Sequence, residues 1–300
     1  MLSFHAITLQ DKGWMSEFYR KADRMDAQYS FAANFIWQDG YRLTACCEQD
    51  VFYLRAHPFG GEPSYRLPLV LREGDLPQAL QRLEQHCREA GEVFRLHGVT
   101  VPEQQMLQQL FPDKYIFTPR RDDAEYIYLR EQLAELSGKK LHAKRNFVNR
   151  FCKQPWSFEP LTAERIAHCR RMHDEWCRRN QCAGSQGLCA ERKALMRCFD
   201  NWEQLDLCGG VLYRGDEPVA YTIGEAVGES TFAVHFEKAF SDVEGAYATV
   251  NQMFIRQSAG ECLYVNREED MGDEGLRKAK LSYGPVQLLE VAEAVLRDEG

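Results

Sequence analysis

The most concentrated charge in the sequence is a basic segment in the middle of the chain. Between Leu136 and Phe158 it has six Lys or Arg residues and no acid, whereas the whole chain carries a net charge of −8. Residues 140 and 144 are spaced as neighbours on one helix face, so they repel each other, and a bound anion would relieve that repulsion. The segment predicts a site for the phosphate groups of a bound molecule. The alternative is a solvated helix face whose charges pair with acids elsewhere. The candidate residues are Lys139, Lys140, Lys144, Arg145 and Asn146.

A loop of mixed charge follows a strand-like run near the C-terminus. After the apolar run that ends at Val265, residues 266–285 contain five acids and four bases. Loops that leave strand ends often carry functional residues, so we expect this one to complete an anionic pocket; a surface turn with self-compensating charges is the alternative. The basic candidates are Arg267, Arg277, Lys278 and Lys280. The acidic candidates, which would bind an amine or take its proton, are Glu268 and Asp270.

A further candidate pair lies on a strand-like run in the second half of the chain. Strict alternation places Phe232, Val234 and Phe236 on one face and His235 and Glu237 on the other. A histidine and a glutamate above small residues could form the wall of a cleft. There Glu237 could bind an amine, and either residue could act as a general base. The alternative is the solvent face of an antiparallel sheet.

Gly245 opens the next helix, which is predicted over residues 245–257. A glycine allows a ligand to approach the free N–H groups of a helix start, where the helix dipole favours anions. Three antiparallel strands precede this helix, and that order is used by folds that bind acyl-CoA. We therefore add Gly245 to the predicted phosphate site.

The elements that must position these residues alternate between helix and strand. The second half is predicted as two helices, three antiparallel strands joined first by a hairpin at residues 214–217, and then helix, strand and helix. This order predicts an α+β fold. The first half has a less distinct version of it, so we expect two domains, at residues 1–125 and 126–300.

The composition argues against several classes of protein. The chain has 44% hydrophobic residues and no run near the ~18 apolar residues of a membrane span. Its N-terminus does not resemble a signal peptide, so we expect a cytoplasmic protein. The acidic balance argues against general DNA binding. The 11 cysteines predict free thiols; a zinc site is the alternative, built from Cys169, His173 and Cys177 with Cys182 and Cys189.

Four segments taken together resemble a known family. They are LSGKKLHAKRNFVNRF, TFAVHFEKAF, GAYATVNQMF and YVNREEDMGDEGLRKAKLSYGPV. They resemble the soluble family related to the C-terminal domain of phosphatidylglycerol lysyltransferases, over about residues 31–289. The resemblance implies two tandem GNAT-like (acyl-CoA N-acyltransferase-type) domains with mixed central sheets, similar to the Fem-type aminoacyltransferases. In the related lysyltransferases this domain moves an amino acid from tRNA to a lipid hydroxyl.

Residues and resemblance together predict a transferase. It would move an acyl or aminoacyl group to an amine or hydroxyl, with aminoacyl-tRNA or acyl-CoA as co-substrate and no permanently bound cofactor or metal. The acceptor is left open among small molecules, peptides and lipids. Two alternatives remain: a non-catalytic GNAT-like module that binds a phosphorylated or acidic ligand, and an interaction protein whose charges pair across the two halves.

Overall fold

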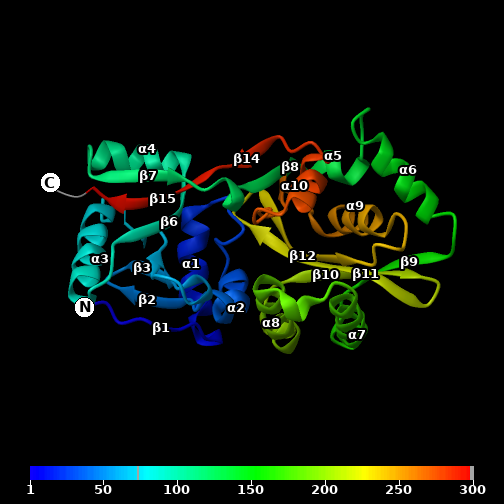
Figure 1. The fold of residues 1–300 in the computed structure, drawn as a ribbon, viewed down its shortest axis with the longest axis horizontal. Coiled ribbons are helices and arrows are strands. Elements are labelled where there is room, and N and C mark those ends of the chain that lie inside the picture. Colours follow the sequence, from blue (N-terminus) through cyan, green and yellow to red (C-terminus); the bar gives the residue numbers. More distant parts are fainter. Residues whose placement is uncertain (73, 298–300) are drawn as a thin grey trace.

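The computed structural model describes residues 1–72 and 74–297. It has two mixed β-sheets, which lie side by side along the long axis of the molecule and carry helices on their faces (Figure 1). Each sheet is largely antiparallel and contains one parallel pair of strands. The two mixed sheets with flanking helices confirm the predicted α+β class.

The first sheet collects most of the N-terminal half. Its strands, in sheet order, are β1 (His5–Ala6), β2 (Thr44–Glu48), β3 (Val51–Ala56), β4 (Ser64–Tyr65), β6 (Arg95–Thr100), β15 (Val291–Leu296) and β7 (Tyr115–Pro119), with β5 (Leu69–Val70) paired to β3. The helices of this half are α1 (Lys12–Ala22), α2 (Phe31–Tyr41), α3 (Leu76–Ala90) and α4 (Val101–Leu110), with 3-10 turns η1 (Leu9–Asp11), η2 (Pro58–Gly60) and η3 (Arg121–Asp123).

The second sheet belongs to the other half. Its strands, in sheet order, are β14 (Gln287–Leu289), β8 (Glu125–Leu129), β13 (Tyr264–Asn266), β12 (Thr231–Ala239), β11 (Glu217–Val227), β10 (Cys208–Arg214) and β9 (Trp156–Pro160). The helices are α5 (Arg130–Glu135), α6 (His142–Phe151), α7 (Ala163–Arg179), α8 (Gln186–Asp200), α9 (Ala246–Ser258) and α10 (Glu274–Leu281), with 3-10 turns η4 (Cys182–Gly184) and η5 (Trp202–Gln204). The predicted hairpin between β10 and β11 is confirmed.

The last strand of the chain returns to the first sheet. Strand β15 lies between β6 and β7 and pairs antiparallel with both, and Figure 1 shows it beside β7, away from α9 and α10. The division at residues 125 and 126 stays a prediction. Strand β15 belongs to the predicted second domain, residues 126–300, yet it completes the first sheet.

Helix α2 has no counterpart among the predicted elements. Its aromatic-rich sequence indicated only that it belongs to the core. Seven of its residues are buried, so it has no polar stripe from which a helical period could be recognised. The Ser30 hydroxyl caps it by accepting from the backbone N–H of Ala33. The helix packs against α8 of the other half, and the ring of Trp37 stacks on that of Phe236 at 6.0 Å.

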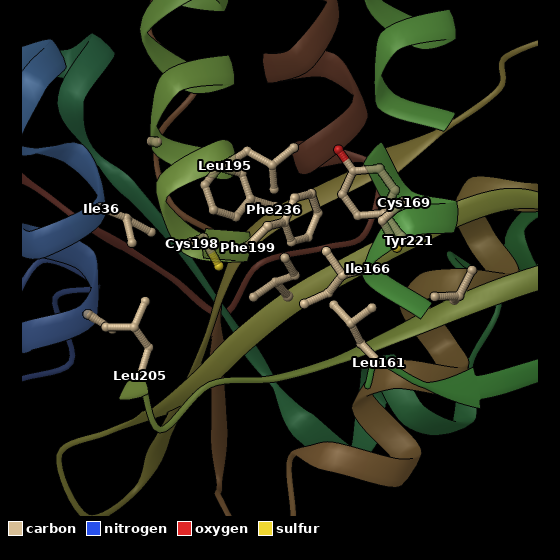
Figure 2. Close-up of a cluster of buried hydrophobic side chains, with 14 of the residues drawn as sticks. Ile36, Leu161, Ile166, Cys169, Leu195, Cys198, Phe199, Leu205, Tyr221 and Phe236 are labelled. Atoms are coloured by element: carbon tan, nitrogen blue, oxygen red, sulfur yellow. The ribbon is translucent and has the colours of Figure 1, made fainter. Parts of the chain in front are cut away.

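One hydrophobic core runs through both halves. Figure 2 shows Ile36 of α2 near Cys198 and Phe199 of α8, with Phe236 of β12 beside them. All four side chains are buried in the same cluster. Because the cluster crosses from one half to the other, the relative position of the two sheets is held by apolar packing.

A β-bulge in β12 overturns the predicted strand faces. Ile223 of β11 faces Phe236, but its neighbour Gly224 faces Val234, so His235 is an extra residue without a partner in the register. An extra residue shifts the alternation of side chains. Phe232 therefore packs on Phe254 of α9, whereas Phe236 packs on α2. The prediction that these two phenylalanines share one face is wrong.

Candidate functional site

The two parallel strands of the second sheet separate to form a fork. Strands β12 and β13 pair only at residues 231–233 and 264–266. Beyond this point β12 continues to Ala239, while β13 ends at Asn266. We call the region between residues 234–239 and the loop 267–270 the second fork, because it belongs to the second sheet and the first sheet has a parallel pair of its own. Most of the predicted site residues lie on its walls or next to it.

The basic segment and the mixed-charge loop meet at Tyr283, on one side of this fork. The Lys144 ammonium nitrogen lies 4.2 Å from the centre of the Tyr283 ring. The Arg267 guanidinium carbon lies 4.7 Å from the same centre. Two cations on one buried ring form a cation–π arrangement in a dry environment. Burial, together with repulsion from Arg267, lowers the pKa of Lys144.

Glu237 and Arg267 form the ion pair in the centre of the fork. Arg267 Nη2 donates to Glu237 Oε1 at 2.8 Å, and Asn251 Nδ2 of α9 donates to Oε2 at 2.9 Å. Burial alone would lower the pKa of Arg267, but the Glu237 carboxylate raises it. A cation and an anion are thus held side by side between the loop after β13 and strand β12.

The remaining basic candidates of the middle segment lie away from this pair. Lys139 and Lys140 are exposed in the turn before α6. Arg145 Nη1 donates to the carbonyls of Leu136 and, at 2.8 Å, of Gly138, so it caps the end of α5. Exposed Asn146 contacts only its helix neighbour His142, at 3.4 Å. Of this segment, the structure brings Lys144 to the fork.

Close packing explains why position 245 is a glycine, whereas the sequence predicted a phosphate site there. A Cβ atom at this position would lie 2.4 Å from the backbone oxygen of Phe147, and its φ of +87° favours glycine in any case. Helix α6 thus lies directly against the start of α9. The structure shows a close helix contact where the sequence predicted room for a phosphate.

Asp270 is enclosed by hydrogen bonds. It accepts from Arg277 through both of its oxygens, at 2.9 and 2.8 Å, from Arg121 at 3.2 Å and from the Tyr126 hydroxyl at 2.6 Å. The Arg277 hydrogen bonds hold the pKa of Asp270 well below its usual range. Arg277 also donates to Asp122 at 2.7 Å. Asp270 and Arg277 therefore anchor the loop to its surroundings and are poorly placed to bind a substrate.

Lys280 and Lys278 have different environments. Lys280 is buried, and its ammonium group donates to the carbonyl of Arg267 at 2.6 Å and to that of Glu269. It therefore fixes the backbone that carries Arg267. Lys278 is exposed on α10. The structure places neither lysine against the Glu237–Arg267 pair.

His235 lies between two carboxylates. Its Nδ1 is 2.8 Å from Glu268 Oε1, and its Nε2 is 2.8 Å from Glu225 Oε1. Burial would lower the pKa of His235, but these two hydrogen bonds raise it to about 10. The imidazole is therefore charged at neutral pH and donates through both nitrogens. It has no free lone pair with which to act as the predicted base.

Four residues of the site were absent from the sequence prediction. Glu225 and Asn251 complete the hydrogen bonds of His235 and Glu237, and Tyr283 supports both cations. Burial, together with the neighbouring Glu268 carboxylate, raises the pKa of Glu269 to about 7. A pKa near neutrality suits a proton acceptor. Nothing in the sequence separates Glu269 from its acidic neighbours, because the shift depends on burial.

The cysteine-rich helices show no metal arrangement. Within residues 1–72 and 74–297, no three His, Cys, Asp or Glu side chains are grouped as metal ligands. The His173 ring instead bridges Tyr221, at 2.8 Å, and Cys177, at 3.3 Å. The 11 cysteines are free thiols.

Membrane-spanning helices are a separate question. Among the helices within residues 1–72 and 74–297, none has the length and the apolar character that a membrane span requires.

The match to a known family decides where this chain belongs. Residues 19–291 match the family described as "Phosphatidylglycerol lysyltransferase, C-terminal". The chain belongs to this family. The resemblance seen in the four sequence segments is thus confirmed, and the matched residues include the whole second sheet, the second fork and most strands of the first sheet. No curated protein matches the chain.

Three solved structures are similar to this chain. A conserved protein of unknown function from Bacteroides thetaiotaomicron VPI-5482 is 38% identical, with a TM-score of 0.93 over 99% of this chain and 100% of that one. FemX is 9% identical, with a TM-score of 0.63 over 97% of each chain. A tandem GNAT protein from the clavulanic acid biosynthesis pathway is 9% identical, with a TM-score of 0.51 over 100% of each chain. The last two share the fold, which confirms two tandem GNAT-like halves.

Proposed function

We propose that this protein transfers an acyl or aminoacyl group from aminoacyl-tRNA or acyl-CoA to an amine or hydroxyl, at the second fork. Family and fold support acyl or aminoacyl transfer as the reaction class. The observation that carries the proposal is the meeting of Lys144 and Arg267 on Tyr283, beside Glu237. Two cations from distant parts of the chain next to a carboxylate suit a donor with anionic and carbonyl oxygens.

The reaction needs little from the protein besides position and proton transfer. The acceptor's nitrogen or oxygen attacks the carbonyl carbon of the donor, and the bond from that carbon to the ester oxygen or the thioester sulfur breaks. The acceptor's proton passes to a carboxylate and then to the departing oxygen or sulfur. The activated ester supplies the driving energy, so holding both substrates in the fork accounts for much of the rate enhancement.

The residues of the fork have separate roles in this proposal. Lys144 and Arg267 hold the donor and stabilise the negative charge that develops on the carbonyl oxygen. Glu237 orients the amine. Glu269, whose pKa is raised to about 7, accepts the proton, because a carboxylate with that pKa is a stronger base than an ordinary exposed one.

Removal of the Lys144 charge tests the proposal. Donor binding to Lys144→Gln is compared with binding to Lys278→Gln, which loses the same charge from an exposed position on α10. We expect Lys144→Gln to lose about tenfold in affinity for CoA or for charged tRNA, measured by isothermal titration, and Lys278→Gln to stay near wild type. Equal affinities of the two variants for both donors would refute the proposed site.

One observation favours a non-catalytic alternative. The carboxylates of Glu237, Glu268 and Asp270 are each held by a cationic side chain. A binding module with such closed pairs would bind a phosphorylated or acidic ligand without turning it over. Saturable donor binding with no transfer to amines or hydroxyls, in a screen of acceptors, would favour this function over the transferase.

A further inference from the structure

Within residues 1–72 and 74–297, three buried polar atoms of residues around Glu237 have no hydrogen-bond partner. They are Nη1 of Arg267, Oδ1 of Asn251 and Oγ1 of Thr222. The Asn251 and Thr222 side chains belong to residues with 0% exposure. Polar atoms in a protein interior are nearly always paired, so several unpaired ones in one place call for an explanation such as a bound group or water.

The three atoms belong to residues that surround one carboxylate. Asn251 and Arg267 each use another of their nitrogens to donate to Glu237, at 2.9 and 2.8 Å. Thr222 lies directly opposite Glu237 in the β11–β12 register. Opposite residues of an antiparallel pair extend to the same face, with their Cβ atoms roughly 5 Å apart. The unpaired atoms therefore come from β11, α9 and the loop after β13, on the face of the sheet that carries Glu237.

The chemistry of these atoms defines what would satisfy them. Arg267 Nη1 can only donate a hydrogen bond, Asn251 Oδ1 can only accept one, and the Thr222 hydroxyl can do both. A matching group needs an oxygen acceptor for Arg267 and at least one N–H donor for Asn251. A carbonyl with an amine or amide nitrogen close by has both. A plain hydrocarbon acyl chain would leave Asn251 and Thr222 unpaired, and burial makes that costly.

We propose that Arg267, Asn251 and Thr222 form a subsite that binds a carbonyl oxygen and a neighbouring N–H or ammonium group of the donor. The proposal rests on the proposed transferase function, because it places the donor's acyl arm in the same fork. Two sources carry this chemistry: the α-amino ester of an aminoacylated RNA, and the amide of the pantetheine arm of CoA. Asn251 and Thr222 would then be the residues that decide which donors are accepted.

The subsite also explains why buried polar atoms are tolerated there. A valine in place of Thr222 would avoid the cost of the unpaired hydroxyl, so it should stabilise the folded protein. Groups kept at the expense of stability are typical of functional sites. A binding role thus predicts opposite effects of one substitution on stability and on affinity, whereas a purely structural role predicts an effect on stability alone.

The test uses the whole protein with two probes. One probe is CoA, and the other is a 3′-aminoacylamino-3′-deoxyadenosine, which mimics the charged end of tRNA with a stable amide. The variants are Thr222→Val and Asn251→Leu. The matched control is Thr249→Val, because the Thr249 hydroxyl is also buried and unpaired, while its position two residues before Asn251 directs it to another side of α9.

We expect Thr222→Val to raise Tm and to weaken binding of one probe by about tenfold, with a similar or larger loss for Asn251→Leu. The probe that loses affinity identifies the source of the amine or amide. Thr249→Val should raise Tm without changing either affinity. If Thr222→Val and Asn251→Leu bind both probes as wild type does, the unpaired atoms hold water only and the subsite is refuted. If wild-type protein binds neither probe, the proposed function fails together with the subsite.

Discussion

The two sheets each contain a parallel fork, and the forks are filled differently. In the first sheet, β4 and β6 pair in parallel at Tyr65 and Leu96. Arg66 follows β4 and is buried there. Its Nη1 donates to the carbonyl of Gly98 at 3.1 Å, and its Nη2 pairs with Asp26. A Cβ atom on Gly98 would lie 1.8 Å from Arg66 Nη1, so this glycine makes room for the arginine.

The second fork also contains a buried arginine, but in a different environment. Arg267 pairs with Glu237, yet its Nη1 has no hydrogen-bond partner in the part of the chain that the structure describes. Next to it lie Lys144 and the ring of Tyr283, from helices and loops outside the fork. We infer that the first fork is a closed structural element and that the second is the one suited to a ligand. Similar folds can thus keep a site in one half alone, because side chains rather than strand order decide what a fork accepts.

A cavity beside the first fork fits this comparison. It has a water-accessible volume of about 10 Å³, and Arg66, Tyr19 and Tyr29 are among its lining residues. The hydroxyl of Tyr29 donates to Glu103 at 3.1 Å, and that of Tyr19 accepts from Asn34 at 3.0 Å. The two tyrosine hydroxyls of its wall therefore have hydrogen-bond partners, in contrast to the unpaired polar atoms around Glu237.

Removal of the Arg66 charge should have the largest effect. Arg66→Met leaves Asp26 buried without its cation, so we expect the free energy of unfolding to fall by about 3–5 kcal/mol, measured by urea denaturation. The double variant Arg66→Met with Asp26→Asn should recover most of this loss, and donor affinity per folded molecule should not change. A loss of donor affinity in the stable double variant would show that the first fork binds ligand too.

Glu237→Gln tests whether the second fork carries the transfer activity. The substitution keeps the shape but removes the charge that would orient an amine, so we expect transfer to fall by about a hundredfold in kcat/KM. The measurement is transfer of a labelled amino acid or acetyl group to an acceptor mixture. The control is Glu244→Gln, which removes an exposed carboxylate paired with Arg150 on the surface. Equal activity of the two variants would contradict a catalytic second fork.

His235 of the second fork predicts a loss of stability at alkaline pH. Its pKa is raised on folding to about 10, from an unfolded value of about 6.5. A raised pKa stabilises the fold fully below the unfolded value, and the contribution is lost as pH rises through the folded one. We expect the free energy of unfolding to decrease from pH 6.5 to 10 by on the order of 4 kcal/mol.

The matching variant for this pH effect is His235→Gln, which cannot carry the charge. Its unfolding free energy should be lower than that of the wild type at pH 6.5 and should vary less over the same pH range, measured by urea denaturation at each pH. If wild type and variant showed parallel pH profiles, His235 would be neutral in the fold, and its role as a proton acceptor would need to be considered again.

The sequence alone determined the family, the α+β class and most of the elements. Helices such as α3 and strands such as β10 and β11 follow from local periodicity, glycine positions and turn residues, which depend on neighbours in the chain. Ser137 and Gly138, which lie between α5 and α6, are local signals of the same kind. Helix α2 was not assigned, because it is buried almost all round and shows no polar stripe.

The tertiary structure alone decided which charged residues are available. Lys144 and Arg145 are adjacent in the sequence, yet one lies on Tyr283 and the other caps α5. The bulge at His235 turned a predicted base into a buried cation between two carboxylates. The physical reason is that a charge is neutralised, or its pKa shifted, by groups a few ångströms away. Those groups come from parts of the chain that only the fold brings together.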